Sequence, residues 1–141
     1  VLSDPLPLFG ISQVEPARRA YSKPIFLLSN TETSSAGEFL AAILKDNGRA
    51  VLLGKTTAGA GGCARTSQLS IPGLSPLTIT WTLGWRRNGI TIENVGIPPD
   101  IVISETLEDL TSNHAQFKRS LCRLITMALH EPKGISVPPL L

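Results

Sequence analysis

Two short apolar runs on either side of one helical pattern constrain the fold of this 141-residue chain most strongly. Residues 25–28 and 50–53 are continuous apolar runs, a pattern typical of strands that are buried on both faces. Residues 35–46 between them carry apolar side chains at helical spacing, and Gly48 follows where a helix would end. The stripe expected to be buried is Phe39, Leu40, Ile43 and Leu44. A strand, a helix and a strand at this spacing predict a βαβ unit with a parallel pair of strands.

Antiparallel structure is expected after the βαβ unit. Residues 66–71 and 77–83 show mixed alternation, and the Pro72-Gly73 and Ser75-Pro76 pairs between them indicate a turn. Asn88-Gly89 is a strong hairpin signal and is expected to join residues 77–86 to residues 90–93. Residues 101–103 are a last short apolar run. The fold class is therefore mixed α/β, with a parallel core and an antiparallel hairpin extension.

The chain divides into three parts. Residues 1–23 contain three prolines and predict an irregular arm, and residues 24–105 form the core. Residues 106–141 hold an amphipathic helix at about 113–130 and a proline-containing tail. The apolar stripe of that helix is Phe117, Leu121, Leu124, Ile125, Ala128 and Leu129.

Composition narrows the possible functions. With 42% apolar and 17% charged residues the chain is expected to be globular, and a net charge of +2 does not favour nucleic acid or membrane partners. No His and Cys cluster has metal-ligand spacing, so neither a metal nor another cofactor is expected. The two cysteines, Cys63 and Cys122, fit either one disulfide bridge or two free thiols. A start at Val1 without Met or a signal pattern predicts a fragment or a processed product.

Ser35 stands where a buried strand is expected to end and a helix to begin, and its hydroxyl has two possible uses. Ser35 and Glu38 fit a capping box, in which the two side chains satisfy free amides of the first turn. Alternatively, Ser35 is a nucleophile, and the N–H of Ala36 at the positive end of the helix dipole stabilises an oxyanion. Local sequence leaves both interpretations open.

Three segments, in this order and spacing, resemble the catalytic half of the C-terminal-processing (tail-specific) serine peptidases. They are residues 33–38 around Ser35, the glycine-rich segment 54–62, and Gly96-Ile97-Pro98-Pro99-Asp100. The resemblance covers about residues 24–105 and implies a crotonase/ClpP-like ββα peptidase core. It implies a serine endopeptidase in which Ser35 attacks the peptide bond and forms an acyl-enzyme. The resemblance also implies that the substrates are proteins or peptides.

One departure from the family decides which base can serve. Many members use a lysine directly after the glycine of the Thr-x-Gly loop, where this chain has Ala60. The sequence is similar instead to a branch that uses Ser, His and Glu, which implies that Glu93 orients a histidine. On local sequence alone, Glu93 is an exposed residue after a hairpin strand. His114 and His130 both fall in the expected C-terminal helix and are unconvincing bases.

The resemblance therefore implies that the base lies in an N-terminal half of the same precursor and that residues 1–141 alone are inactive. It also implies a secreted virulence factor that is made by proteolytic processing, with a homodimer possible. Two other interpretations stay open: a non-catalytic module that binds a peptide or an apolar ligand, and a structural interaction domain. Trp81, Trp85, Arg86 and Arg87 are expected to pack on the hairpin or to contact a partner subunit or the N-terminal half.

Overall fold

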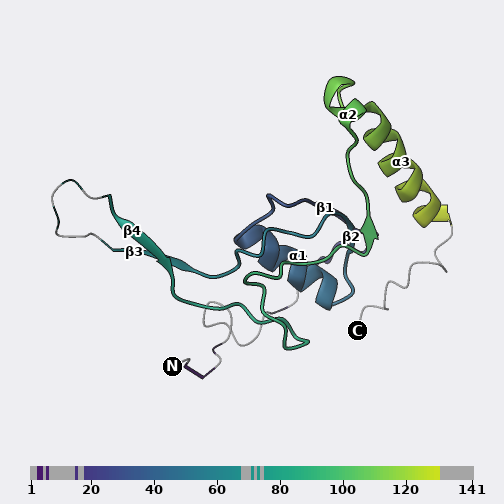
Figure 1. Cartoon of the computed structure of the whole chain (residues 1–141). Coiled ribbons are helices and arrows are strands. Elements are labelled where there is room, and N and C mark those ends of the chain that lie inside the picture. Colours follow the sequence, from purple (N-terminus) through teal and green to yellow (C-terminus); the bar gives the residue numbers. More distant parts are fainter. Residues whose placement is uncertain are drawn as a thin grey trace.

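The computed structural model describes residues 3, 4, 6, 15, 18–67, 71, 73 and 75–130 (Figure 1). Its elements are β1 (Phe26–Ser29), α1 (Ala36–Asp46), β2 (Val51–Gly54), β3 (Ala64–Ser67), β4 (Leu77–Thr80), β5 (Ile101–Val102), α2 (Leu107–Thr111) and α3 (Ala115–His130). Most of the expected arm 1–23 and all of the tail 131–141 lie outside the described residues. Among the described helices, none is long and apolar enough to cross a membrane.

The predicted βαβ unit is confirmed. β1 pairs with β2 in parallel, Phe26 opposite Val51, and β5 pairs in parallel on the other side of β2. β2 is thus the central strand, and all four of its residues are buried. Its side chains alternate between two apolar clusters, as the period of a strand requires. Leu52 faces a cluster with Ala41 and Ala42 of α1, whereas Val51 and Leu53 face the apolar side of α3.

The α1 helix ends where expected but buries a different face. Gly48 has a φ of 61°, and its N–H donates a hydrogen bond to Lys45 O at 2.9 Å, which closes the last turn. The predicted stripe is confirmed at Phe39, which packs against the cluster around Leu52, and wrong at Leu40 and Ile43, which are about half exposed, at 51% and 48%. The buried residues of the helix are Glu38, Ala41 and Ala42. Small alanines let the helix lie close to the sheet, so the larger side chains beside them remain outside.

The C-terminal helical region confirms one prediction and adds an element. Phe117, Leu121, Leu124 and Ile125 of α3 pack against the cluster around Leu53 as predicted, whereas Leu129 of the predicted stripe is exposed. The short α2 was not predicted; Thr106 and Asp109 form a capping box at its start. Hydrogen bonds from the backbone N–H groups of Thr106, Phe117 and Gln116 hold the pKa of Asp109 below its ordinary value. This fully buried carboxylate therefore joins α2 to the start of α3.

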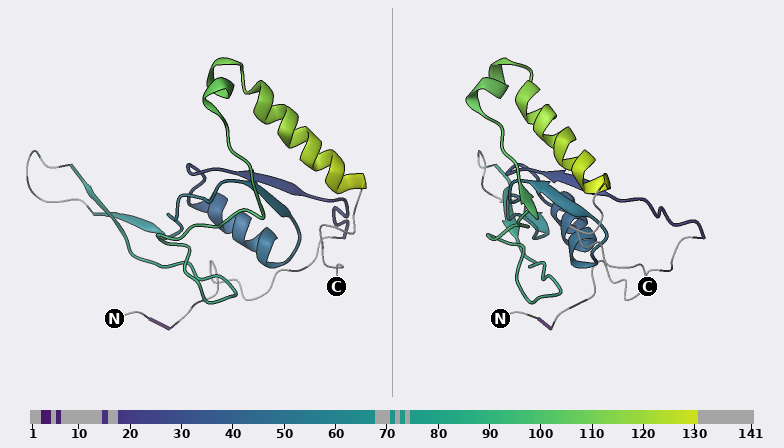
Figure 2. Two further views of the ribbon diagram at one scale, coloured as in Figure 1. Left: turned by 45° about the vertical axis from the view of Figure 1, so that its right-hand side comes forward. Right: turned by 90° about the vertical axis from the view of Figure 1, so that its right-hand side faces the viewer.

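The antiparallel extension is a two-stranded ribbon that projects away from the parallel sheet (Figures 1 and 2). β3 pairs with β4, and Arg65 stands opposite Ile79. This confirms the hairpin predicted across Pro72-Gly73. The second predicted hairpin, at Asn88-Gly89, forms its turn, but its pairing is a single bridge between Trp85 and Thr91. All eight residues of β3 and β4 are exposed, four in each strand.

Candidate active site

Ser35 lies at the turn from β1 into α1 with an unusual backbone conformation. Its φ is 53° and its ψ is −124°, a region that a residue with a Cβ rarely adopts. Such a conformation costs on the order of 1–3 kcal/mol and persists only where the surroundings impose it. The Ser35 N–H donates to Ala60 O at 3.2 Å, so the glycine-rich loop holds the turn from outside. A serine on a sharp strand-to-helix turn is the arrangement that exposes a nucleophile in unrelated hydrolases.

The capping-box interpretation of Ser35 is wrong. Its side chain makes no cap hydrogen bond; instead its carbonyl oxygen accepts from Glu38 N at 3.0 Å and from Phe39 N at 3.3 Å. A side-chain cap works from extended backbone, and a φ of 53° lies outside that region. The hydroxyl has no hydrogen-bond partner within the described residues and is exposed. It is therefore free for chemistry.

Glu38 holds the loop that holds Ser35. Its carboxylate is fully buried and accepts hydrogen bonds from Thr57 Oγ1 at 2.5 Å, Gly59 N at 2.7 Å and Ala60 N at 2.7 Å. A carboxylate that accepts from several backbone amides fixes their direction strongly. Sequence reasoning assigned Glu38 to the capping box and missed this role. The acidic residue three positions after Ser35 and the Thr-x-Gly motif were the available signals.

The same loop is joined to the segment that carries Glu93. Thr57 Oγ1 accepts from Ile97 N at 2.8 Å, and Gly59 O accepts from Asn94 N at 2.8 Å. Gly59 has a φ of 74°, and a Cβ there would lie 3.0 Å from Val95 N. The loop needs glycine at this point because of both the conformation and the close approach.

Glu93 binds the far end of that loop. Its Oε2 accepts from Gly62 N at 2.7 Å, and the residue is half-buried. Gly62 lies two residues beyond Ala60, whose carbonyl holds Ser35, so the structure brings Ser35 and Glu93 to one short loop. No hydrogen bond joins their side chains within the described chain. In a Ser-His-acid triad the acid and the serine likewise do not touch, because the imidazole lies between them.

The two alanines of the site act through their backbones. Ala36 is the first residue of α1, and within the described residues its N–H donates to no acceptor. A free amide at a helix start is a suitable oxyanion donor. Ala60 has both backbone groups occupied, by Ser35 and Glu38, and a methyl side chain that cannot take a proton.

Neither histidine shares a hydrogen bond with Ser35 or Glu93 in the part of the chain that the structure describes. His114 lies before α3, not in it, with a φ of 57° and with Nδ1 2.8 Å from Glu105 Oε1. His130 ends α3, and its Nδ1 lies 2.8 Å from Thr126 O. The described residues also contain no group of His, Cys, Asp and Glu that could hold a metal ion, and both cysteines are free and exposed.

The motif Gly96 to Asp100 serves the frame and not the chemistry. Asp100 Oδ2 accepts from Leu52 N at 2.8 Å, and Oδ1 pairs with Lys45 Nζ at 2.7 Å. Asp100 thus joins β2, the entrance to β5 and the last turn of α1.

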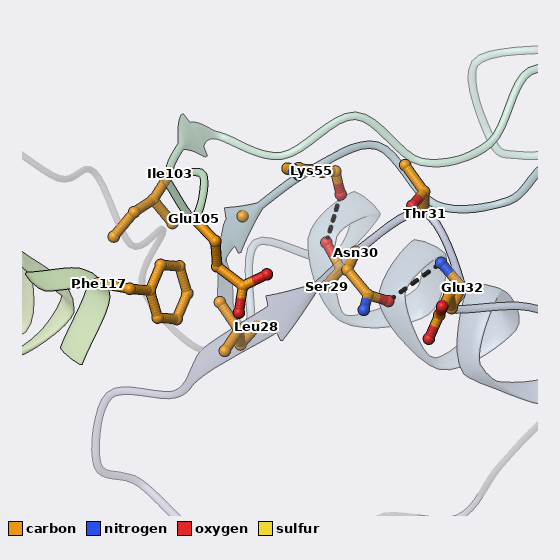
Figure 3. Close-up of a pocket in the computed structure, with 10 residues that line it drawn as sticks. Leu28, Ser29, Asn30, Thr31, Glu32, Lys55, Ile103, Glu105 and Phe117 are labelled. Atoms are coloured by element: carbon orange, nitrogen blue, oxygen red, sulfur yellow. Dashed lines mark hydrogen bonds between the residues drawn. The ribbon is translucent and has the colours of Figure 1, made fainter. Parts of the chain in front are cut away.

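A cavity of about 430 Å³ opens at the carboxyl ends of the parallel strands (Figure 3). Leu28, Ile103 and Phe117 supply apolar walls, and Lys55 and Glu105 supply charges. Phe117 belongs to α3, so the cavity is on the side of the sheet opposite to α1. Ser35 is not among its lining residues, so the cavity adjoins the strand that leads to the site without containing the hydroxyl.

Comparison with known proteins gives concordant matches. The model of peptidase family S41 matches residues 10–103. A Chlamydia pneumoniae protein is 41% identical over 135 residues, which is 92% of this chain and 22% of the relative. The carboxy-terminal-processing protease of Bartonella bacilliformis is 34% identical over 87 residues, 62% of this chain and 20% of that protein.

Solved peptidases share the fold. Mature CPAF in complex with lactacystin superposes with a TM-score of 0.80 and 35% identity, over 90% of this chain and 25% of that one. The predicted fold class and the predicted resemblance to the C-terminal-processing peptidases are therefore confirmed. The resemblance includes CPAF, the chlamydial protease-like activity factor. The chain spans about a fifth to a quarter of the length of these proteins.

Proposed function

This chain belongs to peptidase family S41, and we propose that it carries the nucleophile and the acid of a serine endopeptidase whose base comes from polypeptide outside residues 1–141. The observation that carries the proposal is the conformation of Ser35. A serine with a φ of 53° and an unbonded hydroxyl, held by a loop that also binds Glu93, is costly for a structural residue. That cost is understandable where the turn must present a nucleophile.

In the proposed reaction, Ser35 Oγ attacks the carbonyl carbon of a peptide bond while a histidine takes the hydroxyl proton. The carbonyl oxygen becomes an oxyanion, which accepts a hydrogen bond from Ala36 N–H. The C–N bond then breaks, the histidine gives its proton to the leaving amine, and an acyl-enzyme remains. Water, deprotonated by the same histidine, releases the acyl group and restores Ser35.

Glu93 acts on the histidine and not on the substrate. Oε2 is already engaged by Gly62 N at 2.7 Å, which fixes the direction of the carboxylate. An imidazole between Ser35 and Glu93 would be held in the correct tautomer, and its charged form would be stabilised. Because Ala60 offers no proton acceptor on its side chain, we expect residues 1–141 alone to be inactive.

Labelling with a fluorophosphonate tests this proposal. We expect label on Ser35 and cleavage of a peptide substrate by the longer polypeptide, and neither by residues 1–141 alone. Ser35→Ala should abolish both, while the neighbouring exposed Ser34→Ala should keep both. Label on Ser35 in the isolated chain would mean that a base lies inside it. No label in either form would favour a non-catalytic module that binds a peptide or an apolar ligand.

We also keep secretion and a homodimer as proposals that rest on the family resemblance. Fractionation of the producing cells and sedimentation of the longer polypeptide test them independently of activity.

A further inference from the structure

The glycine-rich loop of the candidate active site has little stiffness of its own. Three of the four residues 59–62 are glycines, and glycine leaves the backbone more conformational freedom than any other residue. The buried Glu38 carboxylate fixes the near end of the loop, because it accepts hydrogen bonds from Gly59 N and Ala60 N. Among the described residues it accepts none from Gly62. The far end, whose N–H binds the acid of the site, therefore depends on another support.

That support comes from the ribbon, at the residue that follows Gly62. Cys63 N donates to Thr82 Oγ1 at 2.8 Å, and Cys63 O accepts from Trp81 N at 3.0 Å. Both backbone groups of Cys63 are thus bound to the two residues that follow β4. Because Cys63 and Gly62 share a peptide group, these bonds restrict the conformation of the residue that binds Glu93.

The ribbon and the Glu93 carboxylate also pack on the same glycine. A Cβ at Gly62 would lie 2.3 Å from Thr80 Cγ2 and 2.5 Å from Thr82 O. It would lie 3.0 Å from Glu93 Oε2. Gly62 therefore leaves no gap between the threonine face of the ribbon and the carboxylate, and a shift of one is transmitted to the other.

The segment after β4 is itself fixed to the body of the molecule. Its side chains alternate, with half-buried Thr82, Gly84 and Arg86 between exposed Trp81, Leu83 and Trp85. Arg86 pairs with Asp46 at the end of α1, with Nε 3.1 Å from Oδ2. Gly84 O accepts from Ile92 N at 2.9 Å, directly before Glu93. The segment thus holds the backbone beside Glu93 and, through Thr82, the loop that binds its carboxylate.

We propose that Thr82 is a positioning residue of the peptidase, which aims the Gly62 N–H at the Glu93 carboxylate. This inference rests on the proposed function. Thr82 Oγ1 holds Cys63 N and so fixes the peptide group between Gly62 and Cys63. Gly62 N then meets Glu93 Oε2 at 2.7 Å in one fixed direction. A carboxylate held in this way orients an imidazole, whereas one that rotates loses that effect. Thr82 acts on the reaction only through Glu93.

Removal of the Thr82 hydroxyl tests the proposal. Thr82→Val keeps the size and branching of the side chain but takes the acceptor away from Cys63 N. In the longer polypeptide we expect kcat to fall about tenfold and KM to change by less than about twofold, because no substrate contact is lost. Thr82→Ser keeps the hydroxyl and should restore most of kcat. Thr78→Val is the matched control, since its hydroxyl lies 2.9 Å from Thr66 Oγ1, within the ribbon.

A double-mutant cycle with Glu93→Gln shows the route by which Thr82 acts. Thr82→Val should cost about tenfold in kcat when Glu93 is present and almost nothing when it is already Gln. A loss of equal size in both backgrounds would overturn the inference, because Thr82 would then act by another route. Full kcat in Thr82→Val would overturn it as well.

The amide proton of Gly62 reads the same contact without turnover. In NMR spectra of the glycine-labelled longer polypeptide, its resonance should move in Thr82→Val and stay in place in Thr82→Ser and Thr78→Val. An unmoved Gly62 resonance in Thr82→Val would overturn the inference even if kcat falls. If Glu93→Gln keeps full kcat, the proposed function fails, whereas a moved Gly62 resonance would still show that Thr82 aims the contact with Glu93.

Discussion

The parallel body and the antiparallel ribbon both contain large apolar side chains, but the body buries them and the ribbon leaves them exposed. In β2 every residue is buried, and its apolar side chains pack against a helix on each face. In β4 apolar residues also recur, but every residue is exposed, and among the described strands β4 pairs only with β3. A two-stranded ribbon is marginally stable by itself. The comparison shows that apolar residues stabilise the frame of the site when they lie in the body, whereas those of the ribbon remain exposed.

The turn at Ser35 depends on the body. A strained serine stays in place only because β1, α1 and the Thr57–Gly62 loop are each fixed by packing or by Glu38.

The largest effect is expected for Glu93, where the two regions meet. Glu93→Gln should lower kcat by about 10⁴-fold in the longer polypeptide, because a neutral amide would no longer orient and stabilise the imidazole. The measurement is turnover of a peptide substrate together with thermal unfolding, which should change little. Glu108→Gln removes an exposed carboxylate elsewhere and is the control. A kcat like that of the unaltered protein would exclude Glu93 from the mechanism.

Two leucine substitutions compare the regions directly. Leu52→Ala removes a fully buried side chain of β2 and should lower the free energy of unfolding by about 2–5 kcal/mol. Leu77→Ala, on the exposed ribbon, should change it by less than about 0.5 kcal/mol. Urea unfolding measures both. Equal losses would mean that the ribbon is part of the stable core.

Glu38→Gln tests whether the negative charge of Glu38 holds the Thr57–Gly62 loop in place. Glu38→Gln keeps the size of the side chain but replaces the carboxylate by an amide, so the N–H groups of Gly59 and Ala60 lose a charged acceptor. We expect a loss of about 1.5–3 kcal/mol in the free energy of unfolding, and lower kcat because the turn at Ser35 loosens. If Glu38→Gln alters stability but not kcat, the carboxylate has no part in positioning Ser35.

A pH-dependent effect on stability is expected away from both regions, at Asp109. Its pKa is lowered in the folded protein, so its contribution is fully present above the ordinary carboxyl pKa of about 3.9 and is lost as the pH falls through the folded pKa. Asp109→Asn should therefore lower Tm at pH 7, and the difference from the unaltered chain should shrink at acidic pH. Thermal unfolding followed by circular dichroism against pH measures this. A difference in Tm that is independent of pH would assign the effect to packing.

Much of the frame is predictable from local pattern. Apolar runs at 25–28 and 50–53, the helix between them and Gly48 at its end are local signals, and the structure confirms the parallel unit they predict. The buried face of α1 was not predictable, because hydrophobicity favours Leu40 and Ile43, whereas close approach to the sheet selects Ala41 and Ala42. Packing distance, which decides that choice, does not appear in a helical pattern.

The candidate active site also combines features that the sequence predicts with features that depend on tertiary packing. The sequence by itself determined which groups are present: a serine at a helix entrance, a glutamate after a hairpin, and an alanine where a lysine could have been the base. Only the tertiary structure decided what they do. The carbonyl of Ala60, 25 residues along the chain from Ser35, holds the strained turn, and Glu38 turns away from the cap to bind the loop. Such contacts are non-local hydrogen bonds, and their partners are chosen by how the sheet and the helices pack, which no local pattern records.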